Sequence, residues 1–302
     1  MNKDSKLKTY SLALLAMFLW GSAFPVLKLT YASFNIAADD YYSKILIAGI
    51  RFLISGILVF CFIYFTKKDD LKYFKGNLKF IIILGLISTT INYIFFYIGV
   101  GNTSGIKSSI LQSTSTFLTV ILAGIFLDEK LTATKILALI LGFIGILVSN
   151  LDKGFDASFK FNGEGFLLIA ALSQAFAVIL VKKHKAYIPS TVLTAGQMLF
   201  GSIVLLAIGA LGSTASLTVT GKGIILLLYS ALISSLAFTI WYYLLNNNPA
   251  SEITMLRLFI PIFGTILSAL VLGESLTYYV LVGLIFVVFG VYVINKKPVT
   301  NR

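Results

Sequence analysis

The chain has 302 residues, of which 58% are hydrophobic and only 12% are charged. A soluble domain of this size carries about 25% charged residues, so the composition excludes a soluble enzyme or binding module and indicates an integral membrane protein. The formal net charge of +12 does not indicate nucleic-acid binding, because the lysines gather in short segments between apolar stretches.

Ten apolar stretches along the chain are long enough to cross a bilayer as helices, which takes about 20 residues each. They cover residues 9–29, 45–65, 78–100, 106–127, 134–150, 164–181, 191–211, 222–245, 249–272 and 275–294. Because few residues remain for loops, we expect an all-α integral membrane fold with ten transmembrane helices and no separate soluble domain.

The distribution of lysine predicts the orientation of these helices. With the N-terminus inside, the inside segments hold most of the basic residues, including the clusters at 66–79 and 182–185. Basic residues favour the cytoplasmic side of a membrane. We therefore predict a multi-pass protein of the cell membrane with both termini in the cytoplasm. The segment 66–79 is expected to lie on anionic lipid headgroups.

The two halves of the chain carry the same pattern at the same spacing. The sequence LGESLT at 272–277 matches LDEKLT at 127–132, which lies 145 residues earlier, and Tyr97 coincides with Tyr242 at that offset. Each half has an odd number of predicted spans, so the second half is inverted relative to the first. An inverted repeat in a membrane is typical of transporters, with the substrate site near the midplane between the halves.

We therefore predict two five-helix repeats, which cover residues 1–150 and 151–302. The last helix of each repeat is almost free of polar residues and carries glycines that allow close helix approach. These glycines are Gly142, Gly145, Gly283 and Gly290. Packing within the chain and packing in a homodimer are both consistent with them.

Polar side chains recur on one face of the predicted helix at 106–127. A polar group inside a bilayer must face protein or a water-filled cavity. A hydroxyl also bonds readily to its own helix, so the stripe is either a cavity wall or a helix–helix contact. Its members are Ser108, Gln112, Ser115 or Thr116, and Thr119.

Aromatic residues occupy matching positions in the third and eighth predicted helices. Two such faces related by symmetry offer a large contact area with few rotatable bonds, and they suit a flat or amphipathic substrate. The alternative is a belt at the membrane interface, which applies most to Tyr97 and Trp241 near the helix ends. The two sets are Tyr93, Phe96 and Tyr97, and Phe238, Trp241 and Tyr242.

Proline interrupts the first and ninth predicted helices. Pro25 and Pro261 have no backbone N–H, so the carbonyls of Gly21 and Arg257 lose their helical partners. Broken helices in corresponding positions mark the sites and gates of many transporters. A packing kink is the alternative interpretation for both prolines.

Arg257 is the most informative single residue, because it lies about eight residues into an apolar span. A charged arginine at that depth costs about 2.5–3.5 kcal/mol on insertion scales. It either extends to the cytoplasmic interface, or pairs with an anionic group of a substrate or with Glu252. Lys107 occupies the position equivalent to Glu252, so these two are expected to form an ion pair across the symmetry axis. Arg51 lies nearer the outer end and is expected to extend to the interface.

Several kinds of chemistry are missing from the sequence. No serine and histidine share a predicted span, the single histidine lies in a lysine cluster, and there is no metal-ligand cluster or P-loop motif. We therefore expect no enzymatic activity, no metal, no cofactor and no binding of ATP.

The whole pattern resembles the EamA type of the drug/metabolite transporter superfamily. The resemblance is carried by the two repeats, WGSAF at 20–24, Arg51-Phe52, and Leu-x-Glu-x-Leu-Thr after the fourth and ninth helices. It implies an inner-membrane carrier, often an exporter of amino acids or related metabolites. By that resemblance, the residues that face the path are Trp20, Tyr93, Gln112, Gln174, Trp241 and Arg257. One departure is Thr116, where the family often has proline.

The sequence thus predicts a secondary transporter that exports amino acids or related small metabolites by alternating access. A membrane channel and a non-transporting scaffold or sensor stay open as alternatives. The predicted pathway residues are Trp20, Asn92, Tyr93, Tyr97, Ser108, Gln112, Ser115, Thr116, Gln174, Phe238, Trp241, Tyr242 and Arg257. The predicted gating residues are Pro25, Lys107, Glu252 and Pro261.

Overall fold

The structure is a computed structural model of the whole chain. It describes residues 3–37, 39–102, 105–148, 151, 159–184, 187–213, 217–273 and 277–295. The regular secondary structure of the described residues is entirely helical, without a β-strand, as the apolar pattern predicts.

Seven of the described helical segments are long and apolar enough to cross a membrane. They are formed by α1 (Lys3–Ser33), α2 (Tyr41–Thr66), α3 (Lys72–Gly85) continuing through η2 (Leu86–Ile91) into α4 (Asn92–Asn102), α7 (Phe166–Lys183), α8 (Ser190–Gly212), α9 (Gly221–Asn247), and α10 (Ala250–Met255) continuing through η5 (Leu256–Leu258) into α11 (Phe259–Leu272). Short turns, η1 (Lys68–Leu71) and η4 (Phe161–Gly165), precede α3 and α7.

Three shorter apolar helices fall within the remaining predicted spans. They are α5 (Gly105–Phe126), α6 (Ala133–Val148) and α12 (Tyr278–Asn295). The chain is therefore a multi-pass, all-helical membrane protein. That all ten segments cross the bilayer as inverted repeats stays a prediction.

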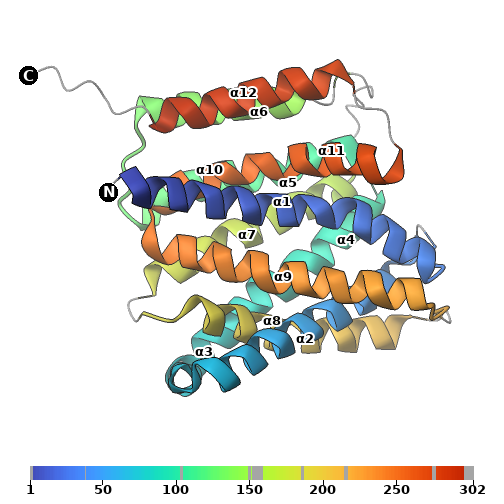
Figure 1. Cartoon of the computed structure of the whole chain (residues 1–302). Coiled ribbons are helices and arrows are strands. Elements are labelled where there is room, and N and C mark those ends of the chain that lie inside the picture. The colour runs from blue at the N-terminus through green and yellow to red at the C-terminus, as the bar shows by residue number, and fades with distance from the viewer. Residues whose placement is uncertain are drawn as a thin grey trace, which may run out of the picture.

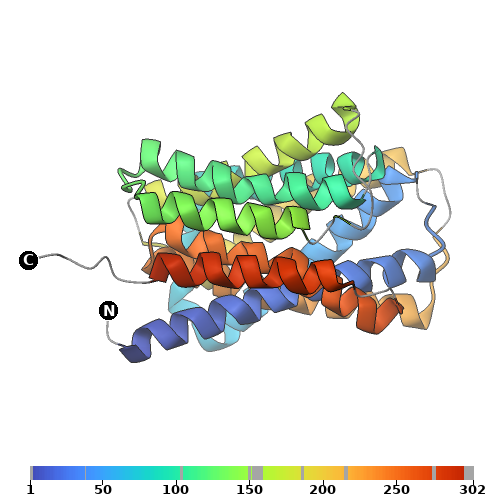
Figure 2. The same ribbon diagram turned by 90° about the horizontal axis from the view of Figure 1, so that it is seen from above.

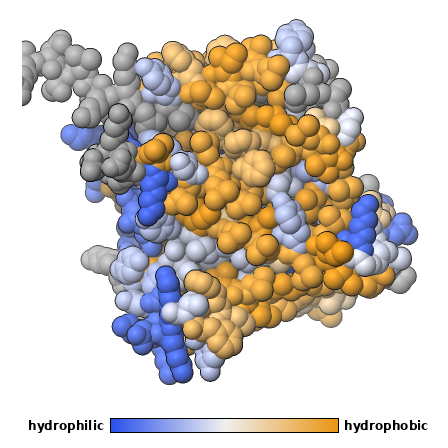
Figure 3. Space-filling view, viewed as in Figure 1, coloured by the Kyte–Doolittle hydropathy of each residue, from blue (hydrophilic) through white to orange (hydrophobic). Residues whose placement is uncertain are grey.

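The helices lie side by side and form a bundle. The start of α1 and the end of α12 lie at the same end of the molecule, on the left in Figure 1. Hydrophobic side chains cover the middle of the visible surface, while hydrophilic ones gather toward the two ends (Figure 3). A bilayer requires this apolar band, because hydrocarbon offers no hydrogen-bond partners to polar groups.

Helix pairs from the two halves of the chain pack against each other. The pairs with the most extensive contact are α2 with α8, α6 with α12, α1 with α9 and with α11, and α5 with α7. The pair α6 and α12 lies at one edge of the bundle, and Figure 2 shows the same bundle from above. The centre is enclosed by α1, α4, α5, α7, α9 and the α10–α11 segment.

Glycine allows α6 and α12 to approach closely. A Cβ atom on Gly145 would lie 2.7 Å from the carbonyl oxygen of Gly283, and one on Gly290 would lie 2.8 Å from that of Ala138. Any larger residue would collide with backbone at these two points. The predicted close approach is thus found within the chain, and the homodimer stays a prediction.

Two of the long segments change their helical geometry near the middle. The η2 segment is a π-helical stretch, and η5 is a 3-10 turn that ends three residues before Pro261. Irregular turns of this kind often mark functional positions in helices. In contrast, α1 continues without interruption through Pro25, so the predicted break in the first helix is not found.

Candidate binding cavity

A cavity of about 130 Å³ lies at the centre of the bundle, and we call it the central cavity. Side chains from α1, α2, α4, α5, α7, α9, η5 and α11 converge on it. It is lined by Trp20, Ala23, Phe24, Leu27, Arg51, Asn92, Tyr93, Phe96, Tyr97, Gln112, Gln174, Phe238, Arg257 and Ile260. Eight of the predicted pathway residues are in this set: Trp20, Asn92, Tyr93, Tyr97, Gln112, Gln174, Phe238 and Arg257.

Arg257 is buried in the wall of the central cavity, with only 8% of its surface exposed. Its position excludes extension to the cytoplasmic interface, which was one of the two predicted alternatives. The guanidinium carbon lies 5.7 Å from the ring centre of Trp20 and 5.3 Å from that of Trp241. Contact with aromatic faces stabilises the cation, because the face of an aromatic ring carries negative charge.

The guanidinium of Arg257 has unused hydrogen-bond donors. Its Nε and one terminal amino group are buried and have no hydrogen-bond partner. Glu252, the predicted partner, is exposed, and the structure shows no ion pair between these two residues. A buried donor without a partner costs about 1–3 kcal/mol, and more when the group is charged. Aromatic faces alone do not satisfy N–H donors. The two free donors and the positive charge therefore suit an anionic ligand.

The backbone around Arg257 departs from a regular α-helix, and this departure helps to place the side chain in the bundle interior. Pro261 has no backbone N–H, so it cannot donate the helical hydrogen bond to the carbonyl of Arg257. The backbone instead tightens into the 3-10 turn Leu256–Leu258 between α10 and α11. This break was predicted from the sequence, and it places the charge at the central cavity.

Two glutamines meet in the wall of the central cavity. Gln112 Nε2 on α5 donates a hydrogen bond of 3.3 Å to Gln174 Oε1 on α7. Gln112 Oε1 is buried and accepts no hydrogen bond, so an acceptor remains in the wall. Asn92 lies nearby and is fixed by a 2.9 Å hydrogen bond from its Nδ2 to the carbonyl of Ala170.

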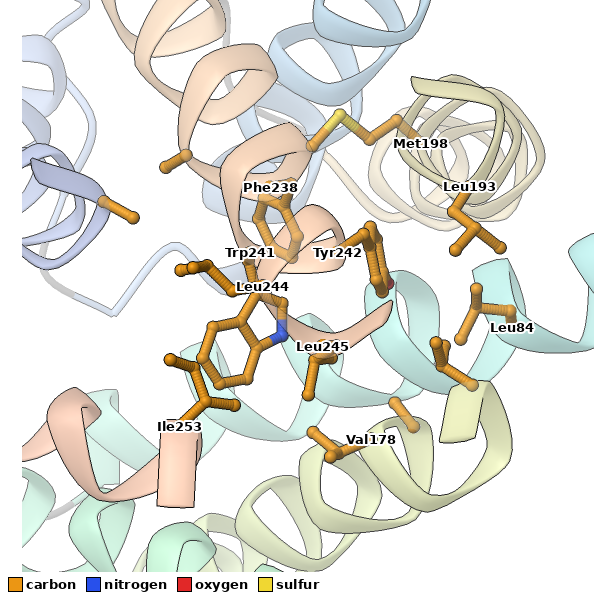
Figure 4. Close-up of a cluster of buried hydrophobic side chains, with 14 of the residues drawn as sticks. Leu84, Val178, Leu193, Met198, Phe238, Trp241, Tyr242, Leu244, Leu245 and Ile253 are labelled. Atoms are coloured by element: carbon orange, nitrogen blue, oxygen red, sulfur yellow. The ribbon is translucent and has the colours of Figure 1, made fainter. Parts of the chain in front are cut away.

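The predicted aromatic faces are buried inside the protein. Tyr97, Trp241 and Tyr242 are 6%, 3% and 3% exposed, which excludes a lipid-facing belt for these side chains. In Figure 4, Phe238, Trp241 and Tyr242 project from α9 in different directions, with Tyr242 toward Leu193. Phe238 lines the cavity, and its ring lies 5.1 Å from that of Trp20. Trp241 lies behind it, in contact with Trp20 and Arg257.

Tyr242 belongs to a buried polar network beside the cavity rather than to its wall. Its hydroxyl donates a 2.6 Å hydrogen bond to Gln197 Oε1, which also accepts one of 2.5 Å from Ser88. These bonds connect α9, α8 and η2. The network therefore holds three helices together, and the predicted pathway role of Tyr242 is not supported by its position.

The polar stripe on α5 is divided between two environments. Gln112 reaches the cavity, whereas Ser115 and Thr116 are 2% and 1% exposed and do not line it. The Thr119 hydroxyl donates to the carbonyl of Ser115, as the alternative of a structural stripe predicts. Ser108 and Lys107 lie in α5, but their side chains are outside the described residues. The predicted pair of Lys107 with Glu252 therefore stays a prediction.

Arg51 was expected at the membrane interface, and this expectation is wrong. Its side chain is 3% exposed and lines the central cavity. Nε donates to the Ser230 carbonyl at 3.2 Å and to Ser234 Oγ at 2.9 Å, so α9 holds the arginine in place. The error came from the predicted start of the helix. The apolar stretch begins after Lys44, whereas the helix begins at Tyr41, so Arg51 lies closer to the helix centre than expected.

A carboxylate with many partners joins the segment after α5 to the start of α10. Glu129 follows α5 and accepts hydrogen bonds from the backbone N–H groups of Ala250 and Ser251, at 2.7 and 3.0 Å, and from the Ser251 hydroxyl. Lys135 Nζ lies 3.9 Å from the carboxylate and donates to Ser251 Oγ. We call this contact the Glu129 cap. It satisfies the N-terminus of α10, where negative charge is favoured.

The Glu129 cap lies at the end of the bundle that carries the lysine-rich segments. At the same end, Lys182 Nζ donates to the carbonyls of Leu245 and Asn248 at 2.9 Å. The ring of His184 is hydrogen-bonded to Asn77 and stacks on Phe80. Partial burial there lowers the pKa of His184 below its ordinary value. Among the described residues, no cluster of three or more histidine, cysteine or acidic side chains is arranged to bind a metal.

Comparison with known proteins places the chain among membrane transporters. The profile described as "EamA-like transporter family" matches residues 7–151 and again residues 161–296. A solved structure titled "Crystal structure of protein" superposes with a TM-score of 0.78 and 15% identity, covering 95% of this chain and 96% of its own. That likeness concerns the fold alone.

Three of the curated relatives match over nearly their full length. An "Uncharacterized transporter" of Archaeoglobus fulgidus is 28% identical, over 96% of this chain and 100% of its own. The "Uncharacterized transporter YvbV" of Bacillus subtilis is 28% identical, over 100% of this chain and 96% of its own. A "Probable amino-acid metabolite efflux pump" of Salmonella typhimurium is 28% identical over 93% of both chains.

Proposed function

The chain belongs to the EamA-like transporter family, and on that premise we propose that it exports amino acids or related small metabolites as a secondary transporter. That it is a membrane transporter rather than an enzyme follows from the family and from the names of its relatives. The substrate class, the direction and the mechanism are the proposal. The efflux pump of Salmonella typhimurium supports the choice of amino-acid metabolites.

One observation carries the proposal, namely the unpartnered guanidinium of Arg257 in the central cavity. Arginine donates two parallel hydrogen bonds to a carboxylate, and its geometry suits a planar anion. A substrate carboxylate would therefore satisfy the two free donors and neutralise the buried charge. In the empty protein the unpaired guanidinium costs free energy. The bound carboxylate removes this cost, so binding is favoured.

The rest of an amino acid also finds suitable partners in the wall. The free acceptor of Gln112, its Oε1, suits an ammonium group, which donates hydrogen bonds and accepts none. The rings of Trp20, Tyr93 and Phe238 provide apolar contact for the remaining atoms. The cavity volume of about 130 Å³ is well below the roughly 300–1,000 Å³ of pockets for drug-sized ligands. A free amino acid is therefore favoured over a peptide or a large drug.

The arrangement of helices supports two inverted five-helix repeats, with residues 1–150 as the first and 151–302 as the second. Shifting α2 and α6 by 145 residues brings them onto α8 and α12, and the end of α1 shifted in the same way overlaps α7. The contacts of α1 with α9 and α11 then correspond to those of α7 with α4 and α5. In Figure 1, α1 begins and α7 ends at the same end of the molecule. An inverted repeat is the architecture on which alternating access is built.

The lysine-rich end is proposed to be the cytoplasmic side of a cell membrane, with both termini there. The Glu129 cap joins the end of α5 to the start of α10 at this end. These two segments come from different repeats, so movement of one repeat against the other would break the cap. We propose that the Glu129 cap closes the inner side of the pathway while substrate leaves on the other side. The flexible point would be the 3-10 turn before Pro261.

Metabolite profiling of the growth medium tests the proposal. Cells that overproduce the wild-type chain are compared with cells that produce Arg257→Gln at equal levels in the membrane. We expect one or more amino-acid metabolites to accumulate in the medium only with the wild type. Uptake of labelled compound into proteoliposomes then shows whether flux saturates, as a carrier requires. Equal media from both strains, together with no saturable flux in proteoliposomes, contradict the proposal.

A further inference from the structure

A second buried arginine lines the same cavity as Arg257. Arg51 on α2 is held from α9 through its Nε, by the carbonyl of Ser230 and the hydroxyl of Ser234. Its guanidinium carbon lies 5.2 Å from the ring centre of Phe52, which limits its movement on one side. The hydrogen bonds to α9 come from Nε, so the terminal amino groups are left to donate into the cavity.

The wall of the central cavity contains no acid to balance these two charges. None of the side chains that line it is an aspartate or a glutamate. In the part of the chain that the structure describes, the carboxylates lie in loops or near helix ends. They are Asp4, Asp39, Asp40, Asp69, Asp70, Asp128, Glu129, Glu164 and Glu252. Of these, Glu129 is bonded to α10 and Lys135, and Glu252 is exposed.

Two guanidinium groups in one cavity raise the cost of the empty site. Arginine keeps its proton in proteins, so neither charge is removed by deprotonation. Like charges repel more strongly inside a protein than in water, because the effective dielectric constant is lower. A zwitterion brings one carboxylate and one ammonium group, so its net charge is zero and the excess positive charge remains. A substrate with two carboxylates and one ammonium group carries a net negative charge and engages both arginines.

We propose that Arg51 is a second anion-binding residue and that the transported amino acid is acidic, with one carboxylate on each arginine. This inference rests on the proposed transport function and makes its substrate class narrower. Arg257 supplies binding for the carboxylate that every amino acid shares. Arg51 then discriminates between an acidic side chain and a neutral one of the same shape.

The comparison of L-glutamate with L-glutamine tests this directly, since the two differ by one charge at nearly equal size. The purified full chain is placed in proteoliposomes, and counterflow of each radiolabelled amino acid is measured. We expect kcat/KM for glutamate to exceed that for glutamine by about tenfold or more, the effect of a charged hydrogen bond. This comparison needs only the wild-type protein.

Variants at Arg51 then test whether this residue causes the preference for glutamate over glutamine. Arg51→Gln is expected to lower glutamate transport until both amino acids are carried equally, whereas Arg51→Lys keeps the charge and part of the preference. Size-exclusion profiles and melting temperatures in detergent show that each variant is folded. A glutamate preference that persists in folded Arg51→Gln overturns the role of Arg51.

The wild-type outcomes separate this inference from the proposed function. If glutamate and glutamine are carried equally well, the acidic substrate class is wrong and the proposed export of amino acids stands. If the wild-type chain carries neither these two nor any other amino acid, the proposed function fails, and the inference fails with it.

Discussion

The partly buried carboxylate of Glu129 and the buried guanidinium of Arg257 have opposite environments, and the difference indicates their roles. The carboxylate of Glu129 accepts three hydrogen bonds from the start of α10 and lies beside Lys135. The guanidinium of Arg257 has two donor nitrogens without a partner and lies between two tryptophans. A charge with a full set of partners holds the protein together. A charge without them is a cost to the empty protein and a binding site for an anion.

The largest effect on transport is expected from replacing Arg257, the charge without partners. Arg257→Gln is expected to lower kcat/KM for amino-acid transport by about 100-fold or more, because a buried ion pair with the substrate is lost. Its melting temperature in detergent is expected to stay the same or to rise, because an uncompensated charge is removed. Counterflow in proteoliposomes and a thermal scan check both parts. A fall in transport that is matched by unfolding would instead give Arg257 a structural role.

Replacing Glu129 is expected to have the opposite profile. Glu129→Gln loses the ionic part of the cap, and we expect it to destabilise the contact between α5 and α10, the proposed inner gate, by about 1.5–3 kcal/mol. The melting temperature falls, and a cysteine placed at Ala23 in the cavity wall, in a Cys61→Ser background, becomes more reactive toward reagents applied from the inside. Asp128→Asn changes the neighbouring exposed acid and serves as the control. Equal reactivity in both variants breaks the link between the cap and the gate.

Overpacking the contact between α6 and α12 tests whether a loss of stability far from the cavity leaves transport unchanged. Gly145→Val places a side chain against the carbonyl of Gly283 and is expected to cost about 1–3 kcal/mol. The amount of folded protein falls, while kcat/KM per folded molecule is retained. Gly76 has open space around its position, so Gly76→Ala is the matched control. Altered substrate selectivity in Gly145→Val contradicts this separation.

The smallest effect is expected from His184. Burial lowers the pKa of its ring in the folded protein, so the unfolded chain binds the proton more readily. Stability therefore falls slightly as pH drops below about 6.5, the ordinary value for histidine, and it recovers above that. His184→Gln removes this contribution. Melting temperatures from pH 5 to pH 8 measure it, and an identical slope in both proteins rules it out.

Much of the fold and part of the cavity are predictable from the sequence. The apolar stretches locate the helices because a membrane span has a fixed minimum length. Arg257, Gln112 and Gln174 stand out because few polar groups occur inside the spans. They meet in one cavity, as the resemblance to the family implies.

The remaining features depend on tertiary contacts that a pattern does not contain. The π-helical turn at Leu86–Ile91 is stabilised by partners from elsewhere in the chain, such as Ser173, which donates to the Ile87 carbonyl. Ser115 and Thr116 share a helical face with Gln112 but are covered by the packed bundle. Arg51 lies on a helix that begins before its apolar stretch, so its depth is underestimated from composition.

A fluorescence titration of the purified protein tests the central claim most directly. Trp20 and Trp241 are the two tryptophans of the chain, and both contact Arg257. An amino acid that binds at Arg257 is therefore predicted to change the intrinsic fluorescence along a saturable curve, with a half-point near the KM for transport. The same titration of Arg257→Gln is predicted to be flat. Saturable transport by the wild type without any change in its fluorescence would place the substrate elsewhere and contradict the account.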